Sequence, residues 1–518
     1  MSPRQIIRIG AAVLFVGIIV FTPAARADVR LPSVIGDHMV MQRDMPLPVW
    51  GWADPGEEVA VTLGDAGIST KAGPDGKWMV KLPVMPAGGP HSLIVKGKNT
   101  ITLTDVLVGE VWVCSGQSNM EMGINSIQDA EKEVAAARYP NIRLYHVCPY
   151  RTATEPQDDF KAEWHPCSPD TIKKTGAFWT SGFPATAYFF GRQLHKELDV
   201  PVGLIATAWG GTRIEPWTPR AGFESVPSLK DIVKVIDEAT PKFNAAVRKA
   251  VEDTEKWLPA AKKAIEEGKR VPPPPEWPKH RLENNAEPTS IYNAMVHPLV
   301  PFGIRGAIWY QGESNHMDGM AYFDKMQALI NGWRKIWAQG DFPFYYVQIA
   351  PFDAIYPDDT LPRLWEAQLA ALSIPNTGMA VTVDIADLKD IHPKNKQDVG
   401  KRLALWALAK TYGKTGFEYS GPLYKSMAVE GSKIRLRFDH VGSGLISRDG
   451  KPLSWFEIAG EDKKFVNAEA VIDGETVVVS SAEVPQPVAV RFGWSRKAEP
   501  NLSNKAGLPA SPFRTDKW

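Results

Sequence analysis

A serine in a short polar turn is the first candidate for chemistry in this sequence. The apolar run of residues 111–114 stops at Ser115-Gly116-Gln117-Ser118. Such a pattern is typical of a buried strand that ends in a tight turn at the edge of a sheet, where glycine lets the chain bend. We therefore expect Ser118 to be a nucleophile that attacks a carbonyl carbon, with Ser115 as a weaker candidate. Met120 replaces the second glycine of the G-x-S-x-G turn, so an ordinary helix N-cap at Ser118 stays open as an alternative.

A histidine with carboxylates just before it could activate such a serine. The segment reads Asp387-Leu388-Lys389-Asp390-Ile391-His392-Pro393. A serine hydroxyl is a weak nucleophile until a base takes its proton, and the base needs a carboxylate that orients it. We predict His392 as the general base and Asp390 as its acid. Asp387 and Glu313 are the alternative acids, and a dyad without a strong acid also stays open.

Two further polar segments follow apolar runs. Gly210-Gly211 offers backbone N–H groups that can approach an oxyanion closely. Gln311 can donate its amide to the same oxyanion, and Glu313 can orient a neighbouring group or a substrate hydroxyl. Taken alone, each segment is equally well explained as an ordinary loop. The candidates for substrate binding in these turns are Gln117, Trp209, Arg213, Glu313 and Asn315.

The apolar runs that precede these turns alternate with helical patterns. Strands are expected within residues 111–114, 202–206, 304–309, 344–349 and 379–385, and helices within 185–198, 321–337 and 399–412. This alternation predicts a parallel sheet with helices on both faces, in which ligands bind beyond the carboxyl ends of the strands. The serine, the glycines, the amide and the histidine would therefore meet at one edge of the sheet. That conjunction favours a serine hydrolase more strongly than any single motif does.

Regions of short strands flank this α/β region. Residues 28–104 carry turn signals such as Asp54-Pro55-Gly56 and predict an N-terminal β-sandwich. Residues 105–415 would form the hydrolase domain, with a helical insertion at about 240–278 that ends at the prolines of 272–275. Residues 416–518 predict a C-terminal β-domain.

The first 27 residues have the pattern of a secretory signal. Arg4 and Arg8 precede an apolar run at 11–21, and Ala25-Arg26-Ala27 offers a cleavage site. We expect a periplasmic or secreted protein without membrane association after cleavage. The formal net charge of zero and the lack of a basic block argue against nucleic acid as a partner. The 18 tryptophans are a mild indication of carbohydrate binding, since aromatic rings stack on sugars.

The cysteines and histidines give no metal signature. The sequence has 3 cysteines and 10 scattered histidines, with no C-x-x-C motif and no histidine cluster at metal-ligand spacing. We expect neither a metal ion nor an organic cofactor. Cys148 and Cys167 could pair in an oxidising compartment, whereas Cys114 within a strand would be a small buried apolar side chain.

As a set, the motifs resemble those of the sialate O-acetylesterase family of SGNH-type carbohydrate esterases. The matching segments are Gly116-Gln117-Ser118-Asn119-Met120, Trp209-Gly210-Gly211-Thr212, Trp309-Tyr310-Gln311-Gly312-Glu313-Ser314-Asn315 and Ile391-His392-Pro393. The resemblance implies a three-layer α/β/α core with a parallel sheet, flanked by N- and C-terminal β-domains and without a metal. It also implies hydrolysis of O-acetyl groups on sugars through an acetyl-enzyme, with Ser118 as nucleophile and His392 as base and then acid.

The resemblance further implies an oxyanion hole made by Gly211 and the Ser118 backbone N–H, with Gln311 where the wider superfamily has an asparagine. That superfamily often places the acid three residues before the histidine, and Lys389 occupies this position here. Asp390 is therefore predicted in its place, with Asp387 and Glu313 still open.

The substrate is not decided by the resemblance. Acetylated sialic acids fit it as well as acetylated plant polysaccharides such as xylan or xyloglucan. Arg213 could pair with a sialate carboxylate, and it could equally form a structural salt bridge. A broader arylesterase and an exported carbohydrate-binding protein with a degenerate hydrolase core are the alternative functions.

Overall fold

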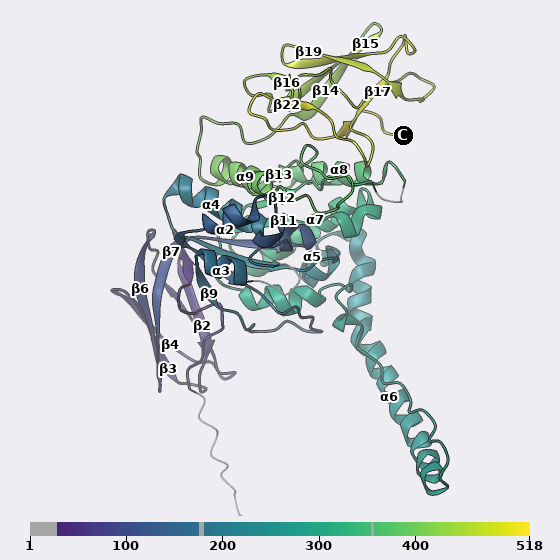
Figure 1. Cartoon of the computed structure of the whole chain (residues 1–518). Helices are drawn as coiled ribbons and strands as arrows, with labels where there is room; N and C mark the ends of the chain where they lie inside the picture. The colour runs from purple at the N-terminus through teal and green to yellow at the C-terminus, as the bar shows by residue number, and fades with distance from the viewer. Residues whose placement is uncertain (1–27, 176–180, 354–356) are drawn as a thin grey trace, which may run out of the picture.

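One long strand connects the N-terminal β-region to the central sheet in this computed structural model, which describes residues 28–175, 181–353 and 357–518 (Figure 1). Strand β7 (Thr100–Gly116) pairs in its first half with β6 (Gly88–Lys96), and its second half lies between β10 (Val202–Ala208) and β11 (Gly306–Tyr310). The boundary expected at residues 104 and 105 therefore falls inside a continuous strand. Burial along β7 is partial in the first half and complete in the second, as expected where helices cover both faces.

The central sheet has the strand order β13-β12-β11-β7-β10-β8-β9, and all its neighbours are parallel except β8 and β9. The remaining bounds are β12 (Phe344–Val347), β13 (Thr377–Ala380), β8 (Tyr139–His146) and β9 (Trp164–Cys167). The predicted strand at 379–385 is thus shifted, because the chain leaves the sheet after Ala380 and continues as a loop. That loop leads to His392.

Helices cover both faces of the sheet, which confirms the predicted three-layer core. On one face, Trp112 of β7 contacts Phe190 of α4 (Ala185–Leu198), and α9 (Lys396–Trp406) packs against α4. On the other face, Trp309 of β11 contacts Trp333 of α7 (Ala321–Trp337). The sequence predicted α4 and α7 with these bounds. The other α-helices are α1 (Ser118–Glu121), α2 (Ala130–Ala135), α3 (Pro169–Lys174), α5 (Arg220–Glu224) and α8 (Thr360–Ala370).

The β-rich regions at both ends of the chain are also as predicted. The N-terminal strands are β1 (Val40–Gln42), β2 (Leu47–Trp52), β3 (Glu58–Leu63), β4 (Ala66–Lys71) and β5 (Lys77–Leu82). The C-terminal strands enclose an apolar core of their own, which includes Ile434, Val477 and Phe492. They are β14 (Leu423–Glu430), β15 (Lys433–Asp439), β16 (Leu445–Ser447), β17 (Phe456–Ala459), β18 (Val466–Asn467), β19 (Glu469–Asp473), β20 (Thr476–Ser480), β21 (Ala489–Phe492), β22 (Leu502–Asn504) and β23 (Phe513–Arg514).

Helix α6 (Lys230–Glu266) projects from the body as a long arm (Figure 1). It begins about ten residues before the predicted insertion and passes through Pro241 and Pro259 without ending. The chain then returns along the helix, where Trp257 Nε1 donates to the Pro272 carbonyl at 2.9 Å. This return brings residues 279–287 back to the body, close to the end of β10.

The cysteines do not pair. All three lie in the described part of the chain, and all three are free thiols. Cys167 is buried at the end of β9, with its Sγ 3.9 Å from the Ala137 carbonyl, whereas Cys148 is half-buried. The predicted secretory signal lies outside the described residues. Among the helices that the structure describes, none has the length and apolar character needed to span a bilayer.

Candidate active site

Ser118 lies directly after the carboxyl end of β7, at the start of the short helix α1. Gly116 approaches the neighbouring strand so closely that a Cβ there would lie 2.1 Å from the Tyr310 carbonyl oxygen, and its φ is +144°. Glycine is therefore required for the turn. Gln117 is the N-cap, so Ser118 is the first helical residue and not the cap. Ser115 is fully buried within β7, which removes it as a nucleophile.

The structure brings His392 to Ser118. His392 Nε2 lies 2.8 Å from Ser118 Oγ, which is hydrogen-bond distance. Burial lowers the pKa of His392 below its ordinary value, and the charge of Asp390 offsets this only in part. A neutral imidazole at this distance can accept the hydroxyl proton.

Asp390 is the carboxylate that lies beside His392. Its Oδ1 is 3.3 Å from His392 Nδ1 and accepts the His392 backbone N–H at 2.9 Å. Burial opposes ionisation of Asp390, but the His392 N–H and the Lys394 ammonium, 3.2 Å away, outweigh it and lower the pKa of this carboxyl. Asp390 therefore stays ionised and can hold the imidazole in one tautomer.

The two alternative carboxylates have other partners. Asp387 accepts the Lys389 backbone N–H at 2.9 Å, within the same loop. Glu313 Oε1 accepts from Asn119 Nδ2 at 2.5 Å, and its Oε2 is buried without a hydrogen-bond partner among the described residues. Burial raises the pKa of Glu313. The geometry thus favours Asp390 over both.

A buried polar chain joins the three turns of the site. Lys396 Nζ donates to Asn119 Oδ1 at 2.5 Å, and Asn119 Nδ2 donates to Glu313 and to the Ile391 carbonyl at 2.9 Å. Burial lowers the pKa of Lys396 to about 7. The residue after the nucleophile is thereby tied to the residue before His392. The sequence motifs contain Asn119 and extend to Lys396, but sequence reasoning assigned neither residue a role.

The glycine pair after β10 lies beside Ser118. Gly211 has φ +73° and lines the same cavity as Ser118 and His392. The Gly210 N–H donates to Glu121 Oε2 at 2.6 Å, which fixes the turn that carries Gly211. Burial raises the pKa of Glu121 to about 7, although the Gly210 N–H acts against this rise. Glu121 also lines the cavity and was not predicted from the sequence.

Gln311 does not reach the cavity, contrary to the prediction. Its side chain is fully buried, and its amide nitrogen donates to the Thr212 carbonyl at 3.2 Å and to Asn315 Oδ1 at 2.7 Å. Its amide oxygen accepts from the Tyr322 hydroxyl at 2.7 Å. Gln311 therefore supports the turn after β10 from the interior and is not an oxyanion donor.

Arg213, which is half-buried, and Asn315, which is buried, do not line the cavity either. Arg213 Nη2 lies 3.0 Å from Glu215 Oε1 and 2.9 Å from Asp318 Oδ1. Asn315 Nδ2 donates to the same two carboxylates, at 3.1 and 2.6 Å. Burial opposes ionisation of Glu215, but Lys325 and Arg213 lower its pKa to about 2. The prediction that Arg213 and Asn315 bind substrate is therefore not supported.

The cavity above Ser118 has a volume of about 780 Å³. Gln117, Trp209 and Glu313, all predicted as binding residues, line it. The Trp209 ring stacks on Tyr150, with ring centroids 4.8 Å apart and an angle of 14° between the planes. In the described part of the chain, no group of three His, Cys, Asp or Glu side chains is arranged to hold a metal ion.

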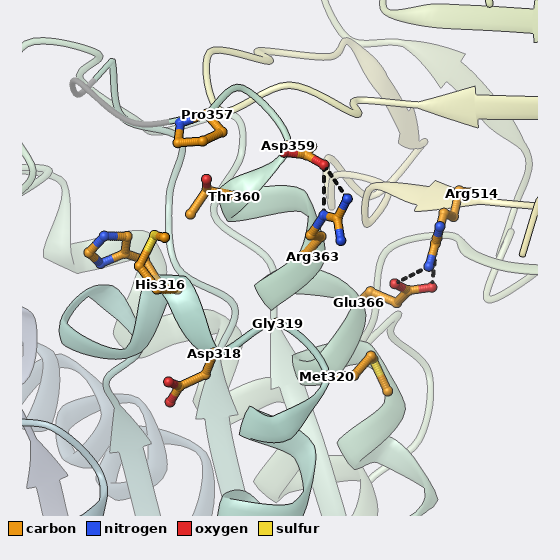
Figure 2. Close-up of a pocket in the computed structure, with 11 residues that line it drawn as sticks. His316, Asp318, Gly319, Met320, Pro357, Asp359, Thr360, Arg363, Glu366 and Arg514 are labelled. Atoms are coloured by element: carbon orange, nitrogen blue, oxygen red, sulfur yellow. Dashed lines mark hydrogen bonds and ion pairs between the residues drawn. The ribbon is translucent and has the colours of Figure 1, made fainter. Parts of the chain in front are cut away.

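Figure 2 shows a separate cavity of about 390 Å³ between the 3-10 turn Glu313–Asp318, α8 and β23. Two ion pairs join charged side chains that line it. Arg363 bonds to Asp359 at 2.7 Å, and Arg514 bonds to Glu366 at 3.0 Å. It lacks both Ser118 and His392, so it is not the site of the proposed chemistry.

A family model described as carbohydrate esterase, sialic acid-specific acetylesterase, matches residues 108–258 and 276–409 of the chain. The chain belongs to this family. The matched residues include Ser118, Gly211, Asp390 and His392, and the gap between them falls at the outer end of the α6 arm.

Comparison with known members extends the match over almost the whole of this chain. The chain is 32% identical to the sialate O-acetylesterase of Rattus norvegicus over 93% of its own length and 94% of that protein. The Mus musculus sialate O-acetylesterase is 30% identical over the same shares of the two chains. The crystal structure of a carbohydrate acetylesterase from Xanthomonas citri superposes with a TM-score of 0.80, at 36% identity, and covers 95% of this chain and 100% of that one. The family resemblance is confirmed, and the chain is a carboxylic ester hydrolase.

Proposed function

We propose that this esterase removes O-acetyl groups from sugars by a serine mechanism. The observation that supports this most directly is the chain of contacts from Asp390 to His392 to Ser118 at the base of a cavity. Residues from two turns, 274 positions apart in sequence, meet there at hydrogen-bond distance. Such a meeting of nucleophile, base and acid is the arrangement that ester hydrolysis by serine requires.

In the first half of the reaction, Ser118 Oγ attacks the carbonyl carbon of the acetyl group while His392 Nε2 takes the hydroxyl proton. The carbonyl oxygen becomes an oxyanion, which the backbone N–H groups of Ser118 and Gly211 stabilise. The bond from the carbonyl carbon to the sugar oxygen then breaks, and His392 gives its proton to that oxygen. The deacetylated sugar leaves, and the acetyl group remains on Ser118.

In the second half, a water molecule attacks the carbonyl carbon of the acetyl-enzyme, and His392 takes a proton from that water. The tetrahedral intermediate collapses, acetate leaves, and the proton returns to Ser118 Oγ. Asp390 stabilises the imidazolium that forms in both halves and does not itself take the proton. No step requires a group from outside the chain other than water.

The residues around the cavity favour a neutral acetylated sugar. The exposed part of Trp209 offers a flat face on which a pyranose ring can stack. Arg213, the cation expected to meet a sialate carboxylate, is already held by Glu215 and Asp318. Lys394 is the cation that lines the cavity, and it pairs with Asp390. Acetylated plant polysaccharides are therefore our first candidate, and acetylated sialic acids are the second, because the mammalian relatives carry that name.

The test is acetate release from acetylated xylan, acetylated xyloglucan and O-acetyl sialic acids, with Ser118→Ala as the control. We expect the wild type to release acetate from the plant polymers faster than from sialosides, and Ser118→Ala to release none above background. Faster acetate release from sialosides would make acetylated sialic acids the first substrate candidate and the plant polysaccharides the second. Equal rates for wild type and Ser118→Ala would refute the proposed function.

A further inference from the structure

A second hollow lies next to the catalytic cavity and shares one wall with it. It has a volume of about 580 Å³, and Trp209 is the residue that lines both spaces. From Trp209 the hollow continues over residues 279–287, the segment that follows the returning chain of the α6 arm. The groove and the catalytic cavity therefore adjoin each other at Trp209.

The far wall of the groove is held by internal bonds. Thr152 Oγ1 donates to the Glu283 carbonyl at 2.7 Å, which ties the loop after Tyr150 to this wall. Arg281 pairs with Glu287 at 2.6 Å, and the Ala286 N–H donates to Asn284 Oδ1 at 2.8 Å. A wall fixed in this way loses little conformational freedom when a ligand binds, which favours binding.

The chemistry of the groove suits sugar hydroxyls. Lys279 and Asn284 are exposed and Asn285 is half-buried, so their donors and acceptors can reach a ligand. His280 is excluded because it is buried, with one ring nitrogen accepting the Leu282 N–H and the other bonded to the Thr240 hydroxyl. Arg281 and Glu287 neutralise each other. The exposed Glu283 carboxylate and the Lys279 ammonium bring opposite charges to the groove, so together with the amides and the aromatic face they match a polyhydroxylated, largely uncharged ligand.

We propose that this groove binds the sugar residues next to the acetylated one, so that the substrate is an oligosaccharide or polysaccharide and not a free acetylated sugar. The inference rests on the proposed function. The acetylated sugar lies over Ser118, its neighbour in the glycan passes Trp209, and the following residues contact Asn285 and Lys279.

The experiment compares two substrates that carry the same ester. One is the acetylated oligosaccharide of four or more residues from whichever polymer releases acetate fastest, and the other is the corresponding O-acetyl monosaccharide. The readout is the ratio of kcat/KM for the oligosaccharide to kcat/KM for the monosaccharide. We expect a wild-type ratio of about ten or more, since two additional hydrogen bonds correspond to at least about this factor.

The double variant Lys279→Ala/Asn285→Ala is expected to lower this ratio about tenfold. Arg363→Ala, in the separate cavity of Figure 2, is the matched control and should keep the wild-type ratio. A wild-type ratio near one would overturn the groove while leaving the esterase function intact. A double variant that folds normally and keeps the wild-type ratio would also overturn it. Failure of the wild type to deacetylate either substrate would instead refute the proposed function.

Discussion

His392 Nε2 lies 2.8 Å from Ser118 Oγ, although 274 residues separate the two in sequence. The distance is maintained by the buried chain beneath it. Asn119, next to the nucleophile, donates to the carbonyl of Ile391, next to the base, and Lys396 holds Asn119 from the other side. The catalytic distance therefore depends in part on Asn119 and Lys396, which do not line the cavity.

The choice of the acid is tested by comparing three substitutions. Asp390→Asn removes the charge beside His392 Nδ1, and we expect kcat to fall about a hundredfold or more. Asp387→Asn and Glu313→Gln should each lower kcat by a smaller factor, because neither carboxylate contacts His392. The measurement is steady-state kinetics on the fastest acetylated glycan. If Asp390→Asn kept a near-normal kcat while Asp387→Asn or Glu313→Gln lost most of it, the acid would be reassigned to that residue.

The pH dependence follows from the lowered pKa of His392. Only the neutral imidazole accepts the Ser118 proton, so kcat/KM should fall as the pH drops through this pKa. Since burial lowers the pKa, we expect the midpoint below the ordinary value of about 6.5. Asp390→Asn removes a charge that raises the pKa, so its midpoint should be lower still. A wild-type midpoint above 7 would contradict this account of the site.

Glu121 is expected to act as a positioning residue for the oxyanion turn. Its carboxylate accepts the Gly210 N–H at 2.6 Å, and glutamine can make the same bond through its amide oxygen. We expect Glu121→Ala to lower kcat about tenfold with little change in KM, and Glu121→Gln to retain most of the activity. Equal losses in both variants would argue against the positioning role.

The buried chain should also contribute to stability. Lys396→Met leaves Asn119 Oδ1 buried without its donor, and a buried polar group left unsatisfied costs about 1–3 kcal/mol. We expect the free energy of unfolding, measured by urea denaturation, to fall by about this amount. Lys401→Met, on the exposed side of α9, is the control and should change it by less than about 0.5 kcal/mol. Similar free energies of unfolding for the two variants would show that the buried hydrogen bonds of Lys396 and Asn119 contribute little to stability.

Residue types at strand ends predicted much of the fold and the catalytic candidates. Ser118, Asp390 and His392 could be found because an α/β sheet brings the ends of its strands to one edge. Gln311, Arg213 and Asn315 come from the same turns, but Gln311 and Asn315 are buried and Arg213 is held by Glu215 and Asp318, so none of the three lines the cavity. A sequence does not say which side of a turn faces the cavity, so these three could not be told apart from true binding residues.

Other differences have separate physical reasons. The sequence pattern places the start of the insertion at about residue 240, whereas α6 begins at Lys230 and continues through both of its internal prolines. The expected domain boundary lies at residue 104 because the sequence pattern changes there from short strands to alternating strands and helices, whereas strand β7 continues across it. Glu121 was missed because a carboxylate one turn after a serine is usually an exposed helix residue, and here it is buried.

The most direct test of the central claim is covalent labelling of the folded wild-type protein with a fluorophosphonate, followed by peptide mass spectrometry. The account predicts one modified residue, Ser118, and loss of esterase activity in proportion to labelling. His392→Ala should label much more slowly, because Ser118 then lacks its base. Absence of labelling in active protein, or modification at Ser115 or elsewhere with Ser118 unmodified, would contradict the assignment of Ser118 as the nucleophile.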